Sequence, residues 1–469
     1  MSARMIAGLA TVCVVGVGLL SAVGPASVPT GAGQQLLPVS AAEAVCPATS
    51  VGKGQTSYLA AAISANSPGS LTLNVHGSAR GSVGAGVADL FSSAVMGAVA
   101  ADVRVTGAAA IGFGAANSLV VPKGPARRWL LRPCAATTPA TWFMGAASVL
   151  GRVATIELVN PDATASQVDL NMFGPDGRID APNGHGIVVP GYASVRVALT
   201  ALAPDVPLLA AEVVAVSGRV SASAYDLASN GLNSLGATTL PSTQAGLRLL
   251  IPAVPAGVSK ATLQVITPAN GGATVQVRLI TSDGRFTPAG GGLLNLVANQ
   301  VVSLDLTQGL AGQAAAILVT SSSPVVAGVR FQTATGKKSA VAVELAPATG
   351  LASQGILPGL VGKASVDVFL AAAGSGGQVS LSVWIAGSAP AAARQVYVPA
   401  DRQLVVRLPA QASWWSLVVT PVSGGALSIT AIASYPVTPG PLVAAVPLVG
   451  LPTTLSLPAA HLDLGVATP

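Results

Sequence analysis

Histidines, the side chains best suited to acid–base catalysis near neutral pH, are few and far apart in this chain. The three are His76, His185 and His461. His185 lies in the segment Asn-Gly-His-Gly at 183–186, a composition typical of a loop between strands. The sequence contains no G-x-S-x-G elbow, no H-E-x-x-H motif and no phosphate-binding P-loop. It therefore favours a protein that is not an enzyme.

Carboxylates could do acid–base or metal chemistry, but their placement favours simpler roles. A glycosidase needs two facing carboxylates, and Glu157 and Asp169 lie on neighbouring predicted strands. Both fall on the outward phase of their strands, which indicates a solvated sheet face. Asp162, Asp176 and Asp180 lie in predicted turns, where aspartate can bind calcium but more often bonds to its own backbone. We predict no metal site and no cofactor.

Aromatic side chains are the remaining candidates for ligand contact. Trp414 and Trp415 are adjacent, so on a strand one points inward and the other outward. Trp129, beside Arg127 and Arg128, is a third candidate. An exposed tryptophan could stack on a sugar ring, whereas a buried one would serve core or interdomain packing.

The cysteines outside the N-terminal segment predict one disulfide. Cys13 lies inside an apolar N-terminal run, which leaves Cys46 and Cys134. In an exported chain such a pair is most simply a disulfide, and the alternative is two free buried thiols. A bond closing a loop of about ninety residues would stabilise the fold by roughly 4 kcal/mol.

The N-terminus has the layout of an export signal. Arg4 precedes an uncharged apolar run from Met5 to Val23, and Gly24 and Pro25 end it. We interpret residues 1–26 as a cleaved signal peptide or, because about nineteen residues can span a bilayer, an uncleaved membrane anchor. Either reading places the protein outside the cytoplasm, in the extracellular space or the cell envelope. The membrane would be contacted only through this segment.

Composition supports an all-β protein with several domains. The chain has 469 residues, of which 9 % are charged and 51 % are hydrophobic, with 53 glycines and 34 prolines. Low charge with many β-branched and turn residues is typical of short strands joined by tight turns. The net charge of +6 is spread thinly and lacks the dense basic stripe of a nucleic-acid-binding protein. We therefore expect no nucleic-acid partner.

An internal repeat of about 105 residues organises the chain. Its opening strand recurs as 154–159, 261–266 and 364–369, and the next strand alternates strictly between apolar and polar residues. The apolar positions of that second strand are Val168, Leu170 and Met172, then Val275, Val277 and Leu279, then Val379, Leu381 and Val383. Period two with one apolar face predicts a strand that covers a core on one side only.

The repeat predicts tandem immunoglobulin-like β-sandwich domains after the N-terminal signal or anchor segment. Asp176-Gly177-Arg178 and Asp283-Gly284-Arg285 are hairpin signals at equivalent positions of the first two repeats. The predicted domains are a degenerate N-terminal β domain at 46–140, sandwich repeats at 141–245, 246–350 and 351–440, and an irregular tail at 441–469.

Several of these residues resemble a known family. The Cys-Pro at Cys46, the Arg-Pro-Cys at 132–134, the pair Trp142-Phe143 and the segment 156–162 are similar to a family of exported actinobacterial proteins that is known as a domain of unknown function. The resemblance is strongest from Trp142 to about Phe331. It implies an envelope location and tandem β domains, and it carries no known activity or catalytic residue.

These observations predict a non-catalytic cell-envelope protein, a structural spacer or a scaffold for partners outside the membrane. The alternative is a glycan-binding module for cell-wall or capsular polysaccharide. Envelope proteins or polysaccharide are the expected partners.

Overall fold

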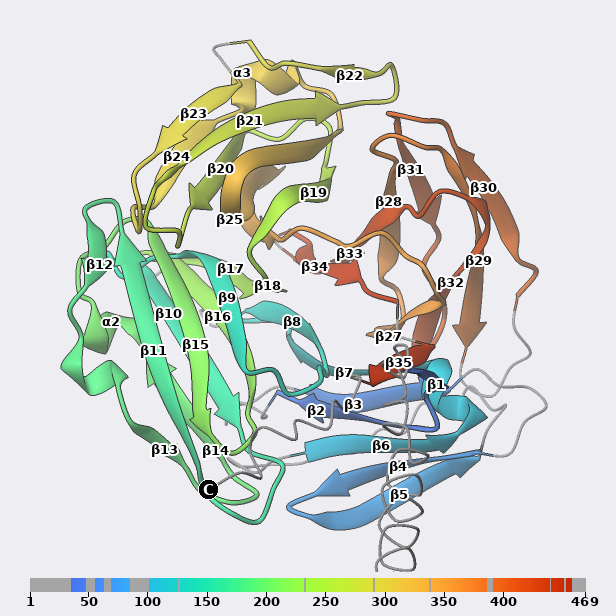
Figure 1. Cartoon of the computed structure of the whole chain (residues 1–469). Helices are drawn as coiled ribbons and strands as arrows, with labels where there is room; N and C mark the ends of the chain where they lie inside the picture. The colour runs from blue at the N-terminus through green and yellow to red at the C-terminus, as the bar shows by residue number, and fades with distance from the viewer. Residues whose placement is uncertain are drawn as a thin grey trace, which may run out of the picture. The chain divides into compact units, whose positions relative to one another are not determined.

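The computed structural model describes residues 35–47, 55–62, 69–84, 101–124, 127–231, 233–289, 292–336, 339–385, 391–438, 440–450 and 453–457. These residues form a nearly all-β protein of paired sheets, which confirms the predicted fold class (Figure 1). The predicted signal or anchor at 1–26 lies outside the described residues. None of the helices among the described residues is long and apolar enough to cross a membrane.

Module 1 runs from β9 to β18 and has two sheets. One contains β12 (Gly177–Ile179), β11 (Ser166–Gly174), β15 (Leu209–Ser217), β9 (Ala140–Ala146) and β18 (Ser242–Thr243), with β13 (Ile187–Val189) paired to β11. The other contains β14 (Ser194–Ala198), β10 (Arg152–Val159), β16 (Ser221–Asn230) and β17 (Asn233–Leu240). The short helices η2 (Pro182–Gly184) and α2 (Leu199–Leu202) connect strands.

The predicted strand phase explains how module 1 closes over its core. Val168, Leu170 and Met172 are fully buried and pack with residues of both sheets. The hairpin from β11 to β12 turns at Pro175 and Asp176 and enters β12 at Gly177, whose φ of 115° is a conformation that glycine adopts without strain. The alternating pattern and the turn therefore give a β-sandwich.

Modules 2 and 3 repeat this plan. Module 2 contains β19 (Gly246–Val254), β20 (Lys260–Ile266), β21 (Ala273–Ile280), β22 (Arg285–Phe286), β23 (Leu293–Leu296), β24 (Val302–Asp305), α3 (Thr307–Leu310), β25 (Ala315–Gly336) and β26 (Ser339–Leu345). β25 is long enough to pair with β19 and β21 in one sheet and with β20 and β26 in the other.

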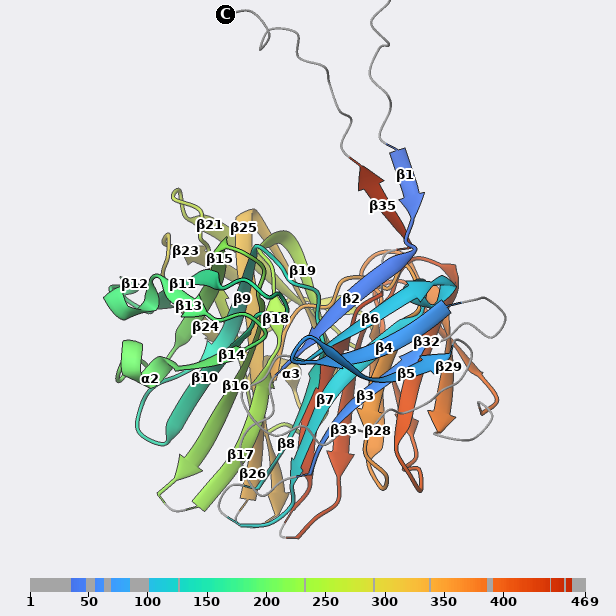
Figure 2. The same ribbon diagram turned by 90° about the horizontal axis from the view of Figure 1, so that it is seen from below.

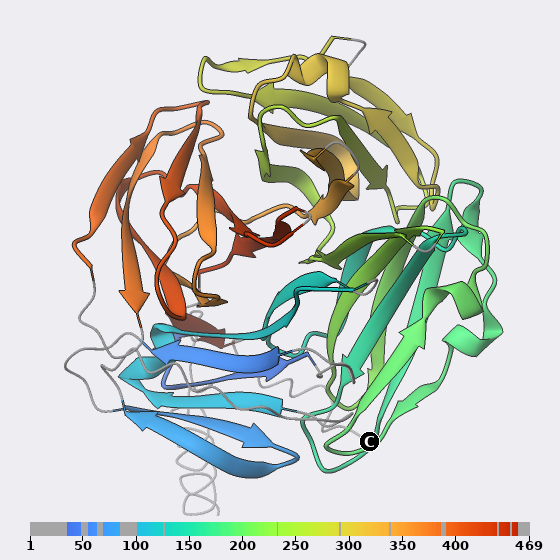
Figure 3. The same cartoon turned by 180° about the vertical axis from the view of Figure 1, so that it is seen from behind.

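Module 3 pairs two sheets of four strands, drawn in orange and red in Figure 3. The first contains β27 (Gly355–Leu360), β32 (Trp415–Gly424), β29 (Gly377–Ile385) and β30 (Arg394–Val398). The second contains β31 (Gln403–Leu408), β28 (Ser365–Ala371), β33 (Ser428–Tyr435) and β34 (Leu442–Leu448).

Module N, which precedes module 1, is also built from two sheets. One contains β2 (Ala41–Cys46), β6 (Ala101–Gly107), β4 (Gly69–Val75) and β5 (Ser78–Gly84), and the other contains β3 (Gln55–Ala62), β7 (Phe113–Val121) and β8 (Arg128–Pro133), with η1 (Ala108–Ile111) leading into β7. Cys46 at the end of β2 is bonded to Cys134 just after β8. The predicted disulfide is confirmed, and it ties one sheet to the other.

The predicted irregular tail at 441–469 needs correction. Leu442–Leu448 forms β34, which pairs with β33 along its whole length and is almost entirely buried. Thr454–Leu457 forms β35, which pairs antiparallel with β1 (Gln35–Pro38) near the start of the chain (Figure 2). Prolines interrupt this segment, but its apolar residues provide enough buried surface for a strand. Residues beyond 457 lie outside the described residues.

The chain divides into two compact units. One holds the β1–β35 pair, and the other runs from Ser40 to Leu451 and holds modules N, 1, 2 and 3. Within this larger unit the modules are linked by strand contacts in the closed order β8 of module N, β17 of module 1, β26 of module 2, β34 of module 3 and back to β8. Each module therefore packs against two others.

Candidate functional site

The junctions between modules hold most of the buried charge in the described part of the chain. The junction between modules N and 1 centres on Arg132 of β8 and Glu157 of β10, whose side chains are 1 % and 0 % exposed. Arg132 donates one Nη1–H to Glu157 Oε2 and an Nη2–H to Asn117 Oδ1 at 2.8 Å. Arg196 of β14 donates to the other carboxylate oxygen at 2.7 Å. Two arginines, one from each module, thus hydrogen-bond to one buried carboxylate.

Glu157 corrects an expectation drawn from its strand phase. We expected a solvated sheet face, but module N covers this face and buries Glu157 completely. Glu157 and Asp169 also do not approach as neighbours in one sheet, because β10 and β11 belong to opposite sheets of the sandwich. Asp169 instead accepts a hydrogen bond from the Gly186 backbone and lies 3.4 Å from His185 Nδ1 at the surface.

A second charged bridge crosses the same junction near the surface. Arg219 of module 1 contacts Glu43 of β2 at 2.9 Å and Asp162 of its own module at 2.6 Å. Arg104 of β6 contacts the other Glu43 oxygen at 3.0 Å. The hydrogen bond from Arg219 lowers the pKa of Asp162, so this carboxylate stays ionised in mildly acidic solution.

The junction between modules 1 and 2 holds four charged residues. Arg152 and Asp226 come from β10 and β16, while Arg330 and Glu344 come from β25 and β26. Asp226 Oδ2 lies 2.6 Å from Arg152 Nη2 and 3.4 Å from Arg330 Nη1. Burial raises the pKa of Asp226 and the two arginines oppose that rise. An apolar contact lies beside this cluster, where Trp142 stacks on Phe173 at 5.2 Å.

The junction between modules 2 and 3 combines apolar packing with hydrogen bonds at its rim. Phe369 and Ile432 of module 3 pack into the core cluster of module 2. Gln403 donates from Nε2 to the Pro252 carbonyl at 2.6 Å, and Arg285 contacts Asp401 at 3.1 Å. These contacts fix the edge of one sandwich to its neighbour.

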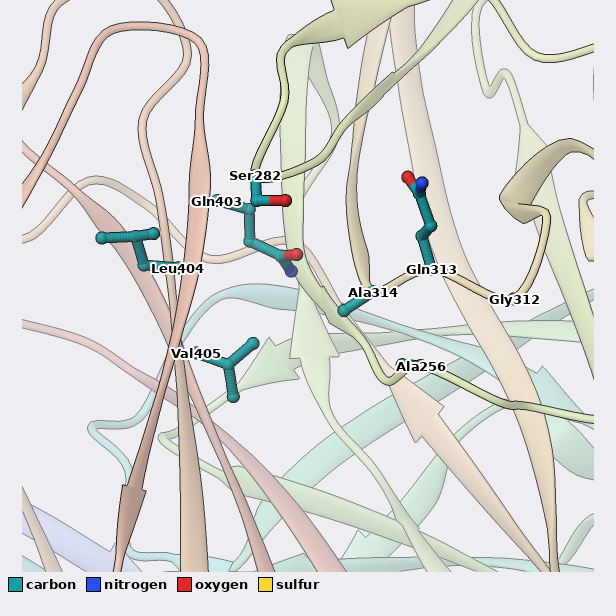
Figure 4. Close-up of a pocket in the computed structure, with 8 residues that line it drawn as sticks. All are labelled: Ala256, Ser282, Gly312, Gln313, Ala314, Gln403, Leu404 and Val405. Atoms are coloured by element: carbon teal, nitrogen blue, oxygen red, sulfur yellow. The ribbon is translucent and has the colours of Figure 1, made fainter.

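A shallow groove of about 440 Å³ opens at this rim (Figure 4). It is lined by Ala256, Ser282, Gly312, Gln313, Ala314, Gln403, Leu404 and Val405. Its lining offers amide and hydroxyl groups over aliphatic carbon and contains no carboxylate, histidine or cysteine. Such a surface can form hydrogen bonds, and its lining offers no carboxylate, imidazole or thiol as an acid, base or thiolate.

The tryptophan candidates serve packing. Trp129 is 1 % exposed, donates from Nε1 to Ser118 Oγ at 3.0 Å and meets Tyr435 of module 3 edge-on at 6.3 Å. Trp415 is fully buried in the same cluster, and its neighbour Trp414 is half-buried against it. Trp129 and Trp415 therefore offer no ring face to a ligand in solvent. They help to seal the junction between modules 3 and N.

Among the described residues no group of three or more histidine, cysteine or acidic side chains could hold a metal ion. Local periodicity does not predict the junction charges, because it identifies a strand face without revealing what covers that face. The scarcity of charged residues in the sequence is the signal that could have predicted these positions. In a chain with so few charges, a glutamate inside an apolar strand, such as Glu157 or Glu344, marks a strand face that another part of the protein covers.

The sandwich modules and their charged junctions define a multidomain β-protein. Residues 90–409 match the family of unknown function DUF5719, so the chain belongs to that family. No curated protein matches the chain.

Three solved structures show weak likeness. The Thermotoga maritima 1070 structure is 9 % identical, with 21 % of this chain and 95 % of that chain covered and a TM-score of 0.19. The Streptomyces avermitilis α-L-rhamnosidase complexed with L-rhamnose is 9 % identical, with 87 % and 57 % covered and a TM-score of 0.13. The infectious bursal disease virus Gx strain structure is 9 % identical, with 96 % and 91 % covered and a TM-score of 0.10. Scores this low carry no inference about this chain.

Proposed function

We propose that this protein is a non-catalytic, exported cell-envelope protein that acts as a rigid spacer or scaffold for partners outside the membrane. The observation that carries the proposal is the way the modules are joined. Each of the four junctions in the cycle combines apolar contacts with hydrogen bonds or ion pairs from both sides. A body joined in this way holds its surfaces at fixed distances, which is what a scaffold requires.

Export is supported by the chain's chemistry. Disulfides persist in oxidising compartments, and the Cys46–Cys134 bond is formed. The uncharged run from Met5 to Val23 after Arg4 supplies an export signal or an anchor. The resemblance to exported actinobacterial proteins agrees with this location. The chain would contact the membrane only through its N-terminal segment.

The absence of a catalytic role is part of the proposal. The buried carboxylates Glu157 and Asp226 are matched by arginines and withdrawn from solvent, so they are placed to stabilise junctions. A catalytic acid or base must reach a substrate, and these groups do not. The expected partners are envelope proteins or polysaccharide held on the outer surface of the body.

Crosslinking in intact cells tests the proposal. The full chain is crosslinked, captured and analysed for bound protein and polysaccharide together. The control carries Val14→Arg and Val17→Arg, which place two charges in the apolar run and should retain the chain in the cytoplasm. We expect extracytoplasmic partners with the native chain and none with the control. Export of the control would contradict the export signal, and cytoplasmic partners for the native chain would contradict the location.

Glycan binding is a second candidate, favoured by the groove between modules 2 and 3. Ser282 and Gln313 border aliphatic side chains there, a combination that can bind sugar hydroxyls and ring carbons. Calorimetry with solubilised cell-wall polysaccharide tests this candidate. Binding that is lost in Gln313→Ala but retained in Gln308→Ala, an exposed glutamine outside the groove, would support it. If the native protein shows no heat of binding, the glycan-binding candidate is contradicted and the scaffold role is the one proposal that stays.

A further inference from the structure

Glu344 differs from the other buried carboxylates because its charge is not directly matched. Its side chain is 1 % exposed, and neither carboxylate oxygen has a hydrogen-bond partner among the described residues. The nearest cationic group is Arg330 Nη1 at 3.9 Å from Oε2. By contrast, Glu157 receives short hydrogen bonds from two arginines.

The Glu344 carboxyl lies between two glycines, one from each module. Gly145 of β9 has a φ of 85°, and a Cβ at this position would overlap the Glu344 carboxyl. A Cβ on Gly328 of β25 would lie 3.0 Å from Glu344 Oε1 and 2.7 Å from Met144 Cβ. The Glu344 backbone N–H donates to Thr238 Oγ1 of module 1 at 3.0 Å. Glu344 is therefore part of the contact that closes modules 1 and 2 on each other.

The charged groups that face Glu344 would compensate little of the negative charge on its carboxylate. Arg330 comes from β25, Arg152 from β10 and Asp226 from β16, while the β9 and β17 residues that contact Glu344 are uncharged. Asp226 receives hydrogen bonds from both arginines and is closer to each. With both carboxylates ionised, Glu344 would be a second buried negative charge with no hydrogen bond, which is costly.

Protonation lowers this cost, because burying a neutral carboxyl without a hydrogen bond costs much less than burying a charge. The neutral acid needs no countercharge and packs between the two glycines. Burial raises the pKa of Glu344 to about 8 from its usual 4.5, against the opposing effect of Arg330 and Arg152. In an opened junction water would reach the carboxyl and favour its ionised form.

We propose that the junction between modules 1 and 2 is a proton-dependent latch, held closed by Glu344 in its neutral form and loosened when Glu344 ionises. The folded pKa of Glu344 is raised, so the protonated group's contribution is complete below about pH 4.5 and is lost as pH rises through about 8. The opening equilibrium should rise by about tenfold for each pH unit within that window. A scaffold with such a junction would be firm in acid and more mobile in alkaline surroundings.

Hydrogen exchange of the full protein measures this opening directly. Peptides from β9 and β26 are followed between pH 5 and 9, after correction for the intrinsic pH dependence of amide exchange. We expect junction exchange to rise with pH in the native protein and to lose most of that rise in Glu344→Gln. The control is Glu212→Gln, a half-buried glutamate on β15 that bonds to Asn171 within module 1 and should keep the native profile. A flat native profile, or an equal rise in Glu344→Gln, would overturn the latch.

A second measurement tests the proposal on the native protein, in case Glu344→Gln fails to fold. The chain contains four glutamates, so carbon-13 labelling of their side-chain carboxyls gives four resonances in the native protein. One of them should titrate near pH 8. If none of the four resonances titrates near pH 8, the proposal fails.

Discussion

Arg132 and Glu157 form an ion pair that joins two modules and is withdrawn from water. The repeat offers a natural comparison for this pair. Glu157 also faces Arg196 across β10 and β14, and Asp367 faces Arg407 across β28 and β31 at the equivalent place in module 3. The Asp367–Arg407 pair is made at 2.8 Å, but Arg407 is 78 % exposed. The same position of the repeat thus holds a carboxylate that is fully buried at a junction in module 1 and a partly exposed carboxylate in module 3.

Breaking the buried pair should be far more costly than breaking the surface pair. Arg132→Ala leaves Glu157 buried with part of its compensation gone, and we expect a loss of about 3–5 kcal/mol. Arg407→Ala exposes only groups that water already reaches, and we expect a loss below about 1 kcal/mol. Urea unfolding followed by circular dichroism measures both. Similar losses for the two variants would mean that the buried pair does not stabilise the junction.

Removing the disulfide should destabilise module N. The bond closes a separation of 88 residues, for which loop entropy gives roughly 4 kcal/mol. The double variant Cys46→Ser and Cys134→Ser should therefore unfold at lower urea than the native protein. Reductant should lower the stability of the native protein to that of the variant and leave the variant unchanged. Equal midpoints for the oxidised and reduced native protein would contradict this.

Gly145 should be intolerant of a side chain for two separable reasons. Alanine at φ 85° is strained, and its Cβ would overlap the Glu344 carboxyl. Gly177 is the matched control, because it has a φ of 115° with no atom within 4 Å of an added Cβ. We expect Gly177→Ala to cost about 1–2 kcal/mol from strain alone and Gly145→Ala to cost more.

A double-mutant cycle isolates the steric part of that effect. Gly145→Ala should be less destabilising in a Glu344→Ala background, because the overlapping carboxyl is gone. Thermal unfolding of the four proteins gives the coupling free energy. Additive effects would show that the carboxyl does not occupy the space above Gly145.

Much of each module could be predicted from its own sequence. Val168, Val275 and Val379 are buried as their alternation predicts, since the two faces of a strand are set by its own residues. The Asp-Gly hairpins form because glycine accepts a positive φ wherever it occurs. Two cysteines outside the apolar N-terminal run left one pairing, and that pairing is present.

The relation between modules could not be predicted in this way. Glu157 lies on the outward face of its strand, as its phase requires, but module N covers that face. The residues Leu442 to Val446 show no alternation because both faces of β34 are covered, on one side by its own sandwich and on the other by neighbouring modules. Alternation reports one exposed face, so a strand buried on both sides lacks the signal.

The four modules form one body, and a single substitution in module 2 can test this claim. Val275 is fully buried in module 2 and Gln276 beside it is exposed. Val275→Asp buries an unpaired charge and should cost more than about 4 kcal/mol, whereas Gln276→Asp should stay within about 0.5 kcal/mol. Hydrogen exchange of Val275→Asp should show lost protection in module 2 and also in β17 of module 1 and β34 of module 3, which contact β26. Loss confined to Gly246–Leu345, with native protection in β17 and β34, would contradict the claim.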